Sequence, residues 1–249
     1  MSSSIHAPRF FIATQLPRAI AFPVLAALDE KVSQHIRVLR LSEGESITLF
    51  DGHGGEFAAT IAAIDKREVS VQLQTHHAIE RESPLNITLV QALATGDKMD
   101  WIIQKATELG VTSIEPVQTQ RATVKLSAER VAKRAAHWQG VAIAACEQCG
   151  RNRVPLIAPV ADLAEWIWRK DDGMRLLLDP VAEIALAGKT KTHASIALMI
   201  GPEGGFTPDE VAAAIRAGVQ AVRFGPRVLR TETAGIAALA ALQAGMGDL

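Results

Sequence analysis

The sequence lacks the features that would place this protein in a membrane or direct it to secretion. Among its 249 residues no apolar run is long enough to cross a bilayer. The N-terminal residues 1–6 lack the basic segment and the apolar stretch of a secretory signal. We therefore expect a cytoplasmic protein without a membrane anchor.

Two fingerprints of phosphate-binding sites are also missing. The sequence contains no Gly-x-x-x-x-Gly-Lys-Ser/Thr and no Gly-x-Gly-x-x-Gly after a strand, so neither a triphosphate loop nor a dinucleotide fingerprint is present. The net charge of -1 shows that the molecule as a whole is not a general binder of nucleic acid. Basic residues are nevertheless in excess between Lys98 and Arg153, which indicates either phosphate contacts or a solvated helix face.

Cysteine is scarce as well, and we expect both cysteines to be structural. Cys146 and Cys149 end a helical pattern that begins at Ser127, and the C-terminal end of a helix disfavours a thiolate. Zinc would need two further ligands at suitable spacing, and only scattered histidines are available. The pair His76-His77 is expected to be solvated, so the sequence predicts no metal site.

Residues 1–75 carry short β-type runs, which predict a small, mostly antiparallel barrel or sandwich. We expect a helix over residues 23–35 and a tight turn at 51–55. The β-type runs are residues 9–13, 36–40, 46–50, 56–64 and 68–73. A polar stretch closed by a proline follows, and we expect it to be a linker over residues 76–84.

In residues 85–249 strands alternate with helices, which predicts an α/β domain with a parallel sheet and helices on both faces. The expected strands include residues 85–93, 114–117 and 175–178, and helices are expected over 97–109 and 127–146. The last expected helix, 234–244, is almost wholly alanine and leucine. It therefore needs a buried place in a core or an interface.

Two glycine-rich turns, each following an apolar segment, give the strongest signal of a binding site. The turn 201–205 leads into Thr207, Pro208 and Glu210, a helix-start signature with a capping box. The second turn begins at Gly225. Two such turns at the same end of neighbouring strands would enclose one small-molecule site. The carboxylate of Glu203 in the first turn disfavours a polyphosphate and suits a cationic or neutral ligand.

The extended sequences of these turns resemble a known family. Ile200-Gly201-Pro202-Glu203-Gly204-Gly205-Phe206 and Leu229-Arg230-Thr231-Glu232-Thr233-Ala234 are similar to signatures of the RsmE family, the ribosomal RNA uracil-N3 methyltransferases of the SPOUT superfamily. Residues 9–11, 35–40, 96–100, 104–111 and 145–149 also resemble this family. The resemblance covers nearly the whole chain.

The resemblance implies a fold, a cofactor and a target. It implies a C-terminal SPOUT α/β domain with a deep trefoil knot, an exception to the rule against threaded chains, and an N-terminal PUA-like RNA-binding β-barrel. It also implies a homodimer that uses S-adenosylmethionine. The target would be a uridine in the decoding region of the 16S RNA of the small ribosomal subunit, position 1498 in the usual numbering (m3U1498).

The implied cofactor would lie against the loops that follow Leu178, Met199 and Phe224. Its sulfonium is positive and its adenine needs backbone hydrogen bonds, which agrees with the missing phosphate-binding residues. The cofactor-binding residues expected from the resemblance are Leu178, Met199, Gly201, Pro202, Gly204, Phe224, Gly225, Leu229, Thr231, Thr233 and Ala234.

Methylation of a uracil imide requires that its proton leave, which puts negative charge on the flanking carbonyl oxygens. Our hypothesis is that Arg230 orients the uracil, with Glu203 or Glu232 as proton acceptor; alternatively, both glutamates only brace the loops. The transfer itself is mainly a positioning task, and the base must be unpaired or flipped out.

Basic residues of both domains are the expected RNA contacts, although each could also be an ordinary surface cation. They are Arg9, His35, Arg37 and Arg40 in the barrel, joined by Lys98, Arg121, Arg151 and Arg153. Those of the barrel and Arg121 are favoured, because they lie in family-like motifs.

Three other functions remain open at this stage. The first is a SPOUT methyltransferase that acts on another RNA site. The second is a non-catalytic RNA-binding protein of ribosome assembly, and the third is a redox or zinc role for Cys146 and Cys149. The last helix is the expected dimer interface, because its apolar faces need partners.

Overall fold

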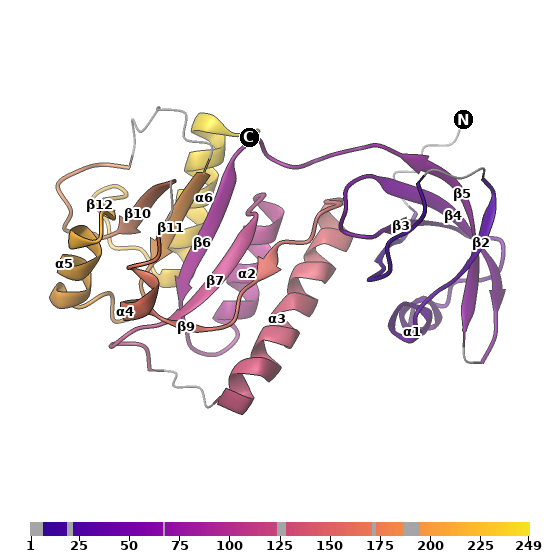
Figure 1. The fold of residues 1–249 in the computed structure, drawn as a ribbon, viewed down its shortest axis with the longest axis horizontal. Helices are drawn as coiled ribbons and strands as arrows, with labels where there is room; N and C mark the ends of the chain where they lie inside the picture. The colour runs from indigo at the N-terminus through magenta and orange to yellow at the C-terminus, as the bar shows by residue number, and fades with distance from the viewer. Residues whose placement is uncertain (1–6, 19–21, 67, 124–127, 171–172, 187–194) are drawn as a thin grey trace. The chain divides into compact units, whose positions relative to one another are not determined.

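The computed structural model describes residues 7–18, 22–66, 68–123, 128–170, 173–186 and 195–249 (Figure 1). The chain folds into two compact units. The first unit contains Met1–Glu82 and Cys146–Val154, and the second contains Ser83–Ala145 and Pro155–Leu249. The short segment 146–154 therefore packs with the N-terminal residues, although the sequence places it inside the expected second domain.

The first unit is built on a five-stranded sheet with the order β1-β3-β4-β5-β2. Strand β1 pairs with β3 in parallel, and the other pairs are antiparallel. Alternate residues of the longer strands, such as Val69, Val71 and Leu73, are buried in one core with side chains of α1, because successive strand residues point to opposite faces. The elements are β1 (Arg9–Phe11), β2 (Val24–Ala27), α1 (Glu30–Val38), β3 (Ser46–Phe50), β4 (Glu56–Ile64) and β5 (Val69–His77).

Two local predictions in this unit were wrong. Residues 36–38, expected to be strand, form the end of α1, and residues 24–27, expected to be helical, form β2. The side chain of Asp29 accepts a hydrogen bond from the Val32 amide and so fixes the start of α1. Val32 and Ile36 lie four residues apart on the buried side of the helix, and this burial outweighs the β-propensity of the segment. Strand β5 also runs two residues into the expected linker.

The second unit is an α/β fold, as predicted. Its seven-stranded sheet has the order β12-β10-β11-β6-β7-β8, with β9 also paired to β7, and every pair is parallel. Its elements are β6 (Asn86–Ala92), α2 (Lys98–Glu108), β7 (Ser113–Gln118), α3 (Ala128–Cys149), β8 (Leu156–Ile157), β9 (Ala161–Asp162), α4 (Leu163–Trp166), β10 (Met174–Leu178), β11 (Ser195–Ile200), α5 (Pro208–Arg216), β12 (Gln220–Val222) and α6 (Thr231–Met246). The last residues of α3 belong to the first unit.

Helices cover both faces of this sheet (Figure 1). Ala197 and Met199 of β11 share one core cluster with residues of α4 and α5. Ile200 points to the opposite face, and there a Cβ on Gly235 of α6 would lie 3.4 Å from its side chain. This distance is an ordinary van der Waals contact, so α6 packs directly on β11 here.

The strand order brings three loops to one edge of the sheet. Strand β10 lies between β11 and β12, and all three are parallel, so the loops that follow them leave the sheet at the same end. In open α/β sheets this end of the strands is where ligands bind.

Candidate functional site

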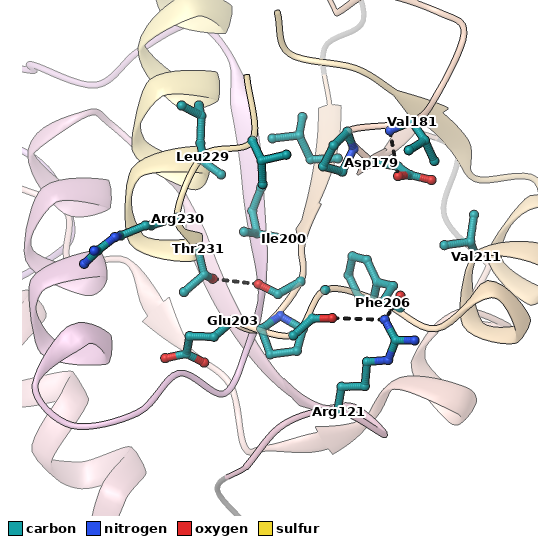
Figure 2. A pocket seen from close by; sticks show the side chains of 18 of the residues that line it. Arg121, Asp179, Val181, Ile200, Glu203, Phe206, Val211, Leu229, Arg230 and Thr231 are labelled. Atoms are coloured by element: carbon teal, nitrogen blue, oxygen red, sulfur yellow. Dashed lines mark hydrogen bonds between the residues drawn. The ribbon is translucent and has the colours of Figure 1, made fainter. Parts of the chain in front are cut away.

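A cavity of about 880 Å³ opens where β10, β11 and β12 end. Its walls are the loops after these strands, the first turn of α6 and side chains of α2 and α5 (Figure 2). The volume lies within the range of roughly 300–1,000 Å³ that is usual for small-molecule sites. Apolar side chains, among them Ile200, Phe206 and Leu229, line it together with backbone of the glycine-rich turn.

The turn between β11 and α5 is fixed at both ends. The Thr207 hydroxyl accepts a hydrogen bond from the Glu210 amide, and the Glu210 carboxylate accepts one from the Thr207 amide, so the predicted capping box is confirmed. The other oxygen of that carboxylate accepts a hydrogen bond from the Gln120 amide at 2.8 Å. Gly205 has φ +67, a left-handed conformation that glycine adopts without strain.

The side chain of Arg121 stabilises the same turn through hydrogen bonds. Its guanidinium donates hydrogen bonds to the carbonyl oxygens of Gly204 and Phe206, at 3.1 and 3.3 Å (Figure 2). The sequence predicts Arg121 as an RNA contact, and the structure places it in the wall of the cavity.

A short polar chain joins the turn to the start of α6. The Thr231 hydroxyl donates to the Gly201 carbonyl at 2.6 Å and accepts from the side-chain amide of Gln91 at 3.0 Å. Gln91 belongs to β6 and is fully buried. The sequence analysis did not single out Gln91; a buried polar residue within an apolar strand was the signal that could have revealed it.

Glu203, a predicted catalytic residue, is held by three donors. One carboxylate oxygen accepts from the Thr95 amide at 3.1 Å, the Thr95 hydroxyl at 2.7 Å and the Lys98 ammonium at 2.9 Å. Burial raises the pKa of this carboxyl, but the hydrogen bonds from Thr95 and Lys98 outweigh it and lower the pKa to about 2. Glu203 therefore stays ionised and is a weak acceptor of protons.

The other two predicted catalytic residues flank Thr231. Arg230 is the N-cap residue of α6 and is exposed, and within the described part of the chain no hydrogen bond or ion pair holds its guanidinium. Figure 2 shows its side chain pointing away from Phe206 and Val211. Glu232 lies in the first turn of α6, with one carboxylate oxygen 3.5 Å from the Lys98 ammonium. Arg230 and Glu203 line the cavity, whereas Glu232 is not part of the lining.

Most of the expected cofactor-binding residues meet at this cavity. The structure brings eight of them into its lining: Leu178, Gly201, Pro202, Gly204, Phe224, Leu229, Thr231 and Ala234. Met199, Gly225 and Thr233 are not in the lining. Met199 is buried in the core shared with α4 and α5. Asp179, Pro180 and Val181, which form the loop after Leu178 that was expected to contact the cofactor, also line the cavity.

The expected RNA contacts of the first unit differ in how they are held. Arg9 is largely buried, pairs with Glu56 at 2.6 Å and donates to the Asn152 side chain at 2.7 Å. Arg37 donates to the Asp65 carbonyl, and the His35 ring packs edge-on against Phe10. Arg40 is exposed, and its side chain makes no hydrogen bond or ion pair among the residues described.

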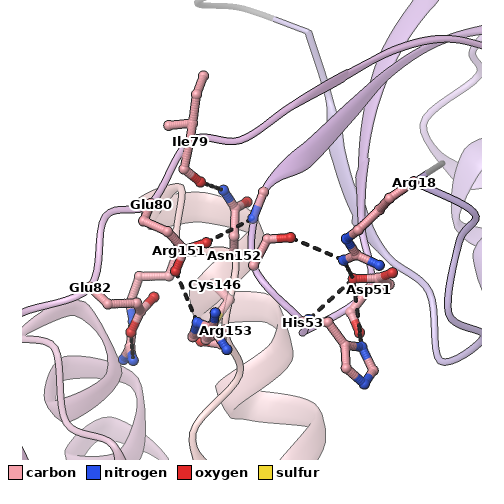
Figure 3. A network of polar contacts seen from close by, with 12 residues as sticks. Arg18, Asp51, His53, Ile79, Glu80, Glu82, Cys146, Arg151, Asn152 and Arg153 are labelled. Atoms are coloured by element: carbon pink, nitrogen blue, oxygen red, sulfur yellow. Dashed lines mark hydrogen bonds and ion pairs between the residues drawn. The ribbon is translucent and has the colours of Figure 1, made fainter.

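Two further expected RNA contacts, Arg151 and Arg153, pair with carboxylates near the end of the first unit (Figure 3). Arg151 is buried and pairs with Glu82, and Arg153 pairs with Glu80 at 2.9 Å. The Asn152 amide donates to the Ile79 carbonyl. These contacts tie the segment 146–154 to residues 79–82 within the first unit.

The cysteines show no catalytic environment. Cys146 is buried, and burial raises the pKa of its thiol to about 12. Over the ranges that the structure describes, no cluster of three metal-ligating side chains occurs. In the same ranges no helix is long and apolar enough to cross a membrane.

Two family models and a sequence relative match this chain. A family model for an RNA methyltransferase domain matches residues 81–243, and a model for an RNA methyltransferase PUA domain matches residues 28–74. The chain is 32% identical over 225 residues to ribosomal RNA small subunit methyltransferase E of Buchnera aphidicola, which covers 90% of this chain and 92% of that protein.

Two solved structures are similar over nearly their whole length. Ribosomal RNA small subunit methyltransferase E of Neisseria gonorrhoeae, bound to S-adenosyl methionine, is 39% identical with a TM-score of 0.90, over 98% of this chain and 100% of that chain. A Legionella pneumophila protein in complex with the same cofactor is 37% identical with a TM-score of 0.92, over the same shares of the two chains.

Proposed function

Because the chain belongs to the ribosomal RNA small subunit methyltransferase E family, we propose that it methylates N3 of one uridine in 16S RNA, position 1498, with S-adenosylmethionine as the methyl donor. The observation that carries the proposal is the cavity at the ends of β10, β11 and β12, walled by backbone and apolar side chains. In this proposal the protein acts in the cytoplasm, where ribosomal RNA is found.

The residues around the cavity fit this donor. The carboxylates of Glu203 and Asp179 in the lining suit the positive charge of a sulfonium and would repel a polyphosphate. Ile200, Phe206 and Leu229 offer apolar surface to an adenine ring. When bound, the donor supplies an electrophilic methyl group.

In the proposed reaction the protein orients the uracil and stabilises its charge. Three arginines of the cavity lining, Arg121, Arg227 and Arg230, have no carboxylate partner among the described residues. We choose Arg230 because it directly precedes Thr231 at the start of α6, and its exposed guanidinium is available to the carbonyl oxygens that flank N3. Three donors hold the Glu203 carboxylate ionised, whereas Glu232 Oε2 accepts no hydrogen bond from the described residues. We therefore assign the proton acceptor to Glu232.

We propose that the first unit, which matches the PUA domain model over residues 28–74, contacts the RNA. Arg40, His35 and Arg37 are the leading contacts, since all three lie on or directly after α1 and Arg40 is exposed. Arg9, Arg121, Arg151 and Arg153 remain predicted contacts, and each also holds a carboxylate or a backbone carbonyl of its own unit.

The homodimer and the trefoil knot are also proposals. Helix α6 supports the dimer, because Ile236, Ala237 and Ala240 are only partly buried in the single chain. A second copy would cover this apolar side. Light scattering of the purified protein tests the dimer, and a monomeric mass at micromolar concentration would contradict it.

Calorimetry and methyl transfer together test the proposed function. We expect one molecule of S-adenosylmethionine to bind per chain, and we expect label from its methyl group to enter small-subunit RNA. Large-subunit RNA serves as the matched control and should stay unlabelled. Binding of the donor without transfer to either RNA would favour a non-catalytic RNA-binding protein.

A further inference from the structure

The ammonium group of Lys98 lies between the two carboxylates of the site. Lys98 is the first residue of α2, and its Nζ is 2.9 Å from Glu203 Oε1 and 3.5 Å from Glu232 Oε2. Glu203 belongs to the turn after β11 and Glu232 to the first turn of α6. One ammonium therefore connects three elements that are far apart in the sequence.

The charge of Lys98 allows these two carboxylates to lie close together. Glu232 Oε2 is buried and accepts no hydrogen bond from any described residue, so Lys98 is the cation that offsets its charge. The hydrogen bond to Glu203 raises the pKa of Lys98, which keeps the ammonium protonated. Without Lys98 the two carboxylates would repel each other and the turn and the helix would be free to separate.

The same three charges make Lys98 a poor partner for a phosphate. Lys98, Glu203 and Glu232 together carry a net negative charge, so an approaching phosphate would meet two carboxylates around one ammonium. A phosphate contact would also require Lys98 to leave partners that are already in place.

The position of Arg230 depends on the residues that follow it. Thr231 is tied to Gly201 and Gln91 by hydrogen bonds, and Glu232 is tied to α2 by Lys98. The backbone at the start of α6 is thereby fixed on two sides, while the Arg230 side chain remains available.

We propose that Lys98 is a positioning residue of the methyltransferase site, which acts through Glu232 and Glu203 to hold the start of α6 and Arg230 beside the cavity. Lys98 is then not an RNA contact, in contrast to what its sequence context predicts. This inference rests on the proposed function, because positioning matters only if the base is methylated here.

The test compares Lys98→Met with Lys98→Arg, Glu232→Gln and the double variant of Lys98→Met and Glu232→Gln. Lys105→Met is the matched control, since Lys105 lies in the same helix, pairs with Glu108 and does not line the cavity. The measurements are the single-turnover rate at saturating RNA, the Kd for S-adenosylmethionine and the salt dependence of RNA binding. Rates are normalised to the fraction of protein that binds the donor, so a partly unfolded variant remains informative.

We expect Lys98→Met to lower the single-turnover rate about 10- to 100-fold, as misplacement of reacting groups does, with the Kd for the donor changed less than about threefold. Lys98→Arg should recover most of the rate. The double variant should be no slower than the slower single variant, because residues that act as a unit are not additive. The salt slope of RNA binding should match that of the wild type and of Lys105→Met.

Three results would overturn the inference. A wild-type rate in Lys98→Met would remove any positioning role, and additive losses in the double variant would show that Lys98 does not act through Glu232. A salt slope smaller by about 0.7–0.9 would identify Lys98 as a phosphate contact. If the wild type itself transfers no methyl group, the proposed function fails, and a double-mutant cycle on thermal unfolding then measures the coupling of Lys98 to Glu232 directly.

Discussion

At the scale of single residues, the site contains charges that hold one another and charges that lack an acidic partner. Lys98, Glu203 and Glu232 hold one another, whereas the guanidinium of Arg230 is exposed and makes no hydrogen bond or ion pair with a described residue. The sequence indicated that charged residues gather in these turns. It could not indicate which of them neutralise each other, because the partners come from segments more than a hundred residues apart.

The free guanidinium gives the first prediction. Arg230→Ala should lower the rate of methyl transfer about 10²- to 10³-fold, the usual loss when one donor to a developing oxyanion is removed. The affinity for S-adenosylmethionine should change little. Arg230→Lys keeps the charge but loses the bidentate donor geometry of a guanidinium. Its rate of methyl transfer should therefore lie between the rates of the wild type and of Arg230→Ala. Turnover at the wild-type rate in Arg230→Ala would rule out the assigned role.

The low pKa of Glu203 gives a prediction about acid stability. In the folded protein the pKa is about 2, against 4.5 for an ordinary glutamate, so the ionised form stabilises the fold. The stability that wild type gains over Glu203→Gln should be complete above pH 4.5 and should be lost as the pH falls from 4.5 toward 2. Urea unfolding of both proteins at several pH values measures this difference.

The exposed Asp248 provides the matched control for that measurement, as Asp248→Asn. Asp248→Asn measures the change in unfolding free energy when an exposed carboxylate outside the site is removed, and it is compared with Glu203→Gln at each pH. A difference between wild type and Glu203→Gln that stays constant from pH 6 to 3 would show that the carboxylate is not held as described.

At the scale of elements, helix starts were the most predictable feature. Thr207, Pro208 and Glu210 predicted the start of α5, and the capping box is present. The start of α1 was predicted at residue 23 and lies at Glu30, because the role of Asp29 as the N-cap residue was missed. Local capping chemistry can be read from a sequence, but which side of a segment is buried depends on the rest of the fold.

The capping box gives a prediction about stability. Thr207→Ala should lower the free energy of unfolding by about 1 kcal/mol, within the range of roughly 0.5–2 kcal/mol for a lost N-cap. Thr207→Ser keeps the hydroxyl and should lose much less. Chemical denaturation of the three proteins measures this, and equal losses for alanine and serine would show that the hydroxyl bond contributes nothing.

The order of the strands could not be predicted from the sequence. Alternating strands and helices indicated a parallel sheet, but not that β10 lies between β11 and β12. The family resemblance, and not the strand pattern, predicted that the loop after Leu178 belongs to the site together with the two glycine-rich turns, and Asp179, Pro180 and Val181 of this loop line the cavity. Adjacency in a parallel sheet is set by crossover connections and not by local patterns.

At the scale of the whole molecule, counting basic residues overstated the surface available to RNA. Arg9, Arg151 and Arg153 are expected RNA contacts, yet each pairs with a carboxylate of its own unit. The side chain of Arg40 is exposed and makes no hydrogen bond or ion pair with a described residue. A basic residue is the stronger candidate for an RNA contact when the fold leaves it without an acidic partner.

This contrast gives a prediction for RNA binding. Arg40→Ala should weaken binding and reduce the salt slope by about 0.7–0.9, the effect of one lost phosphate contact. Arg9→Ala should instead lower the thermal stability, because Glu56 and Asn152 each lose one hydrogen-bond partner. Binding titrations at several salt concentrations and thermal melts separate the two effects. An unchanged slope in Arg40→Ala would remove Arg40 from the RNA surface.

The most direct test of the central claim is the identity of the methylated nucleoside. Purified protein is incubated with S-adenosylmethionine and small subunits from cells that lack this modification, and the 16S RNA is digested, mapped by mass and compared with nucleoside standards. We predict one 3-methyluridine per RNA, at position 1498. A methyl group on another atom or another nucleotide, with none on uracil N3, would contradict the account.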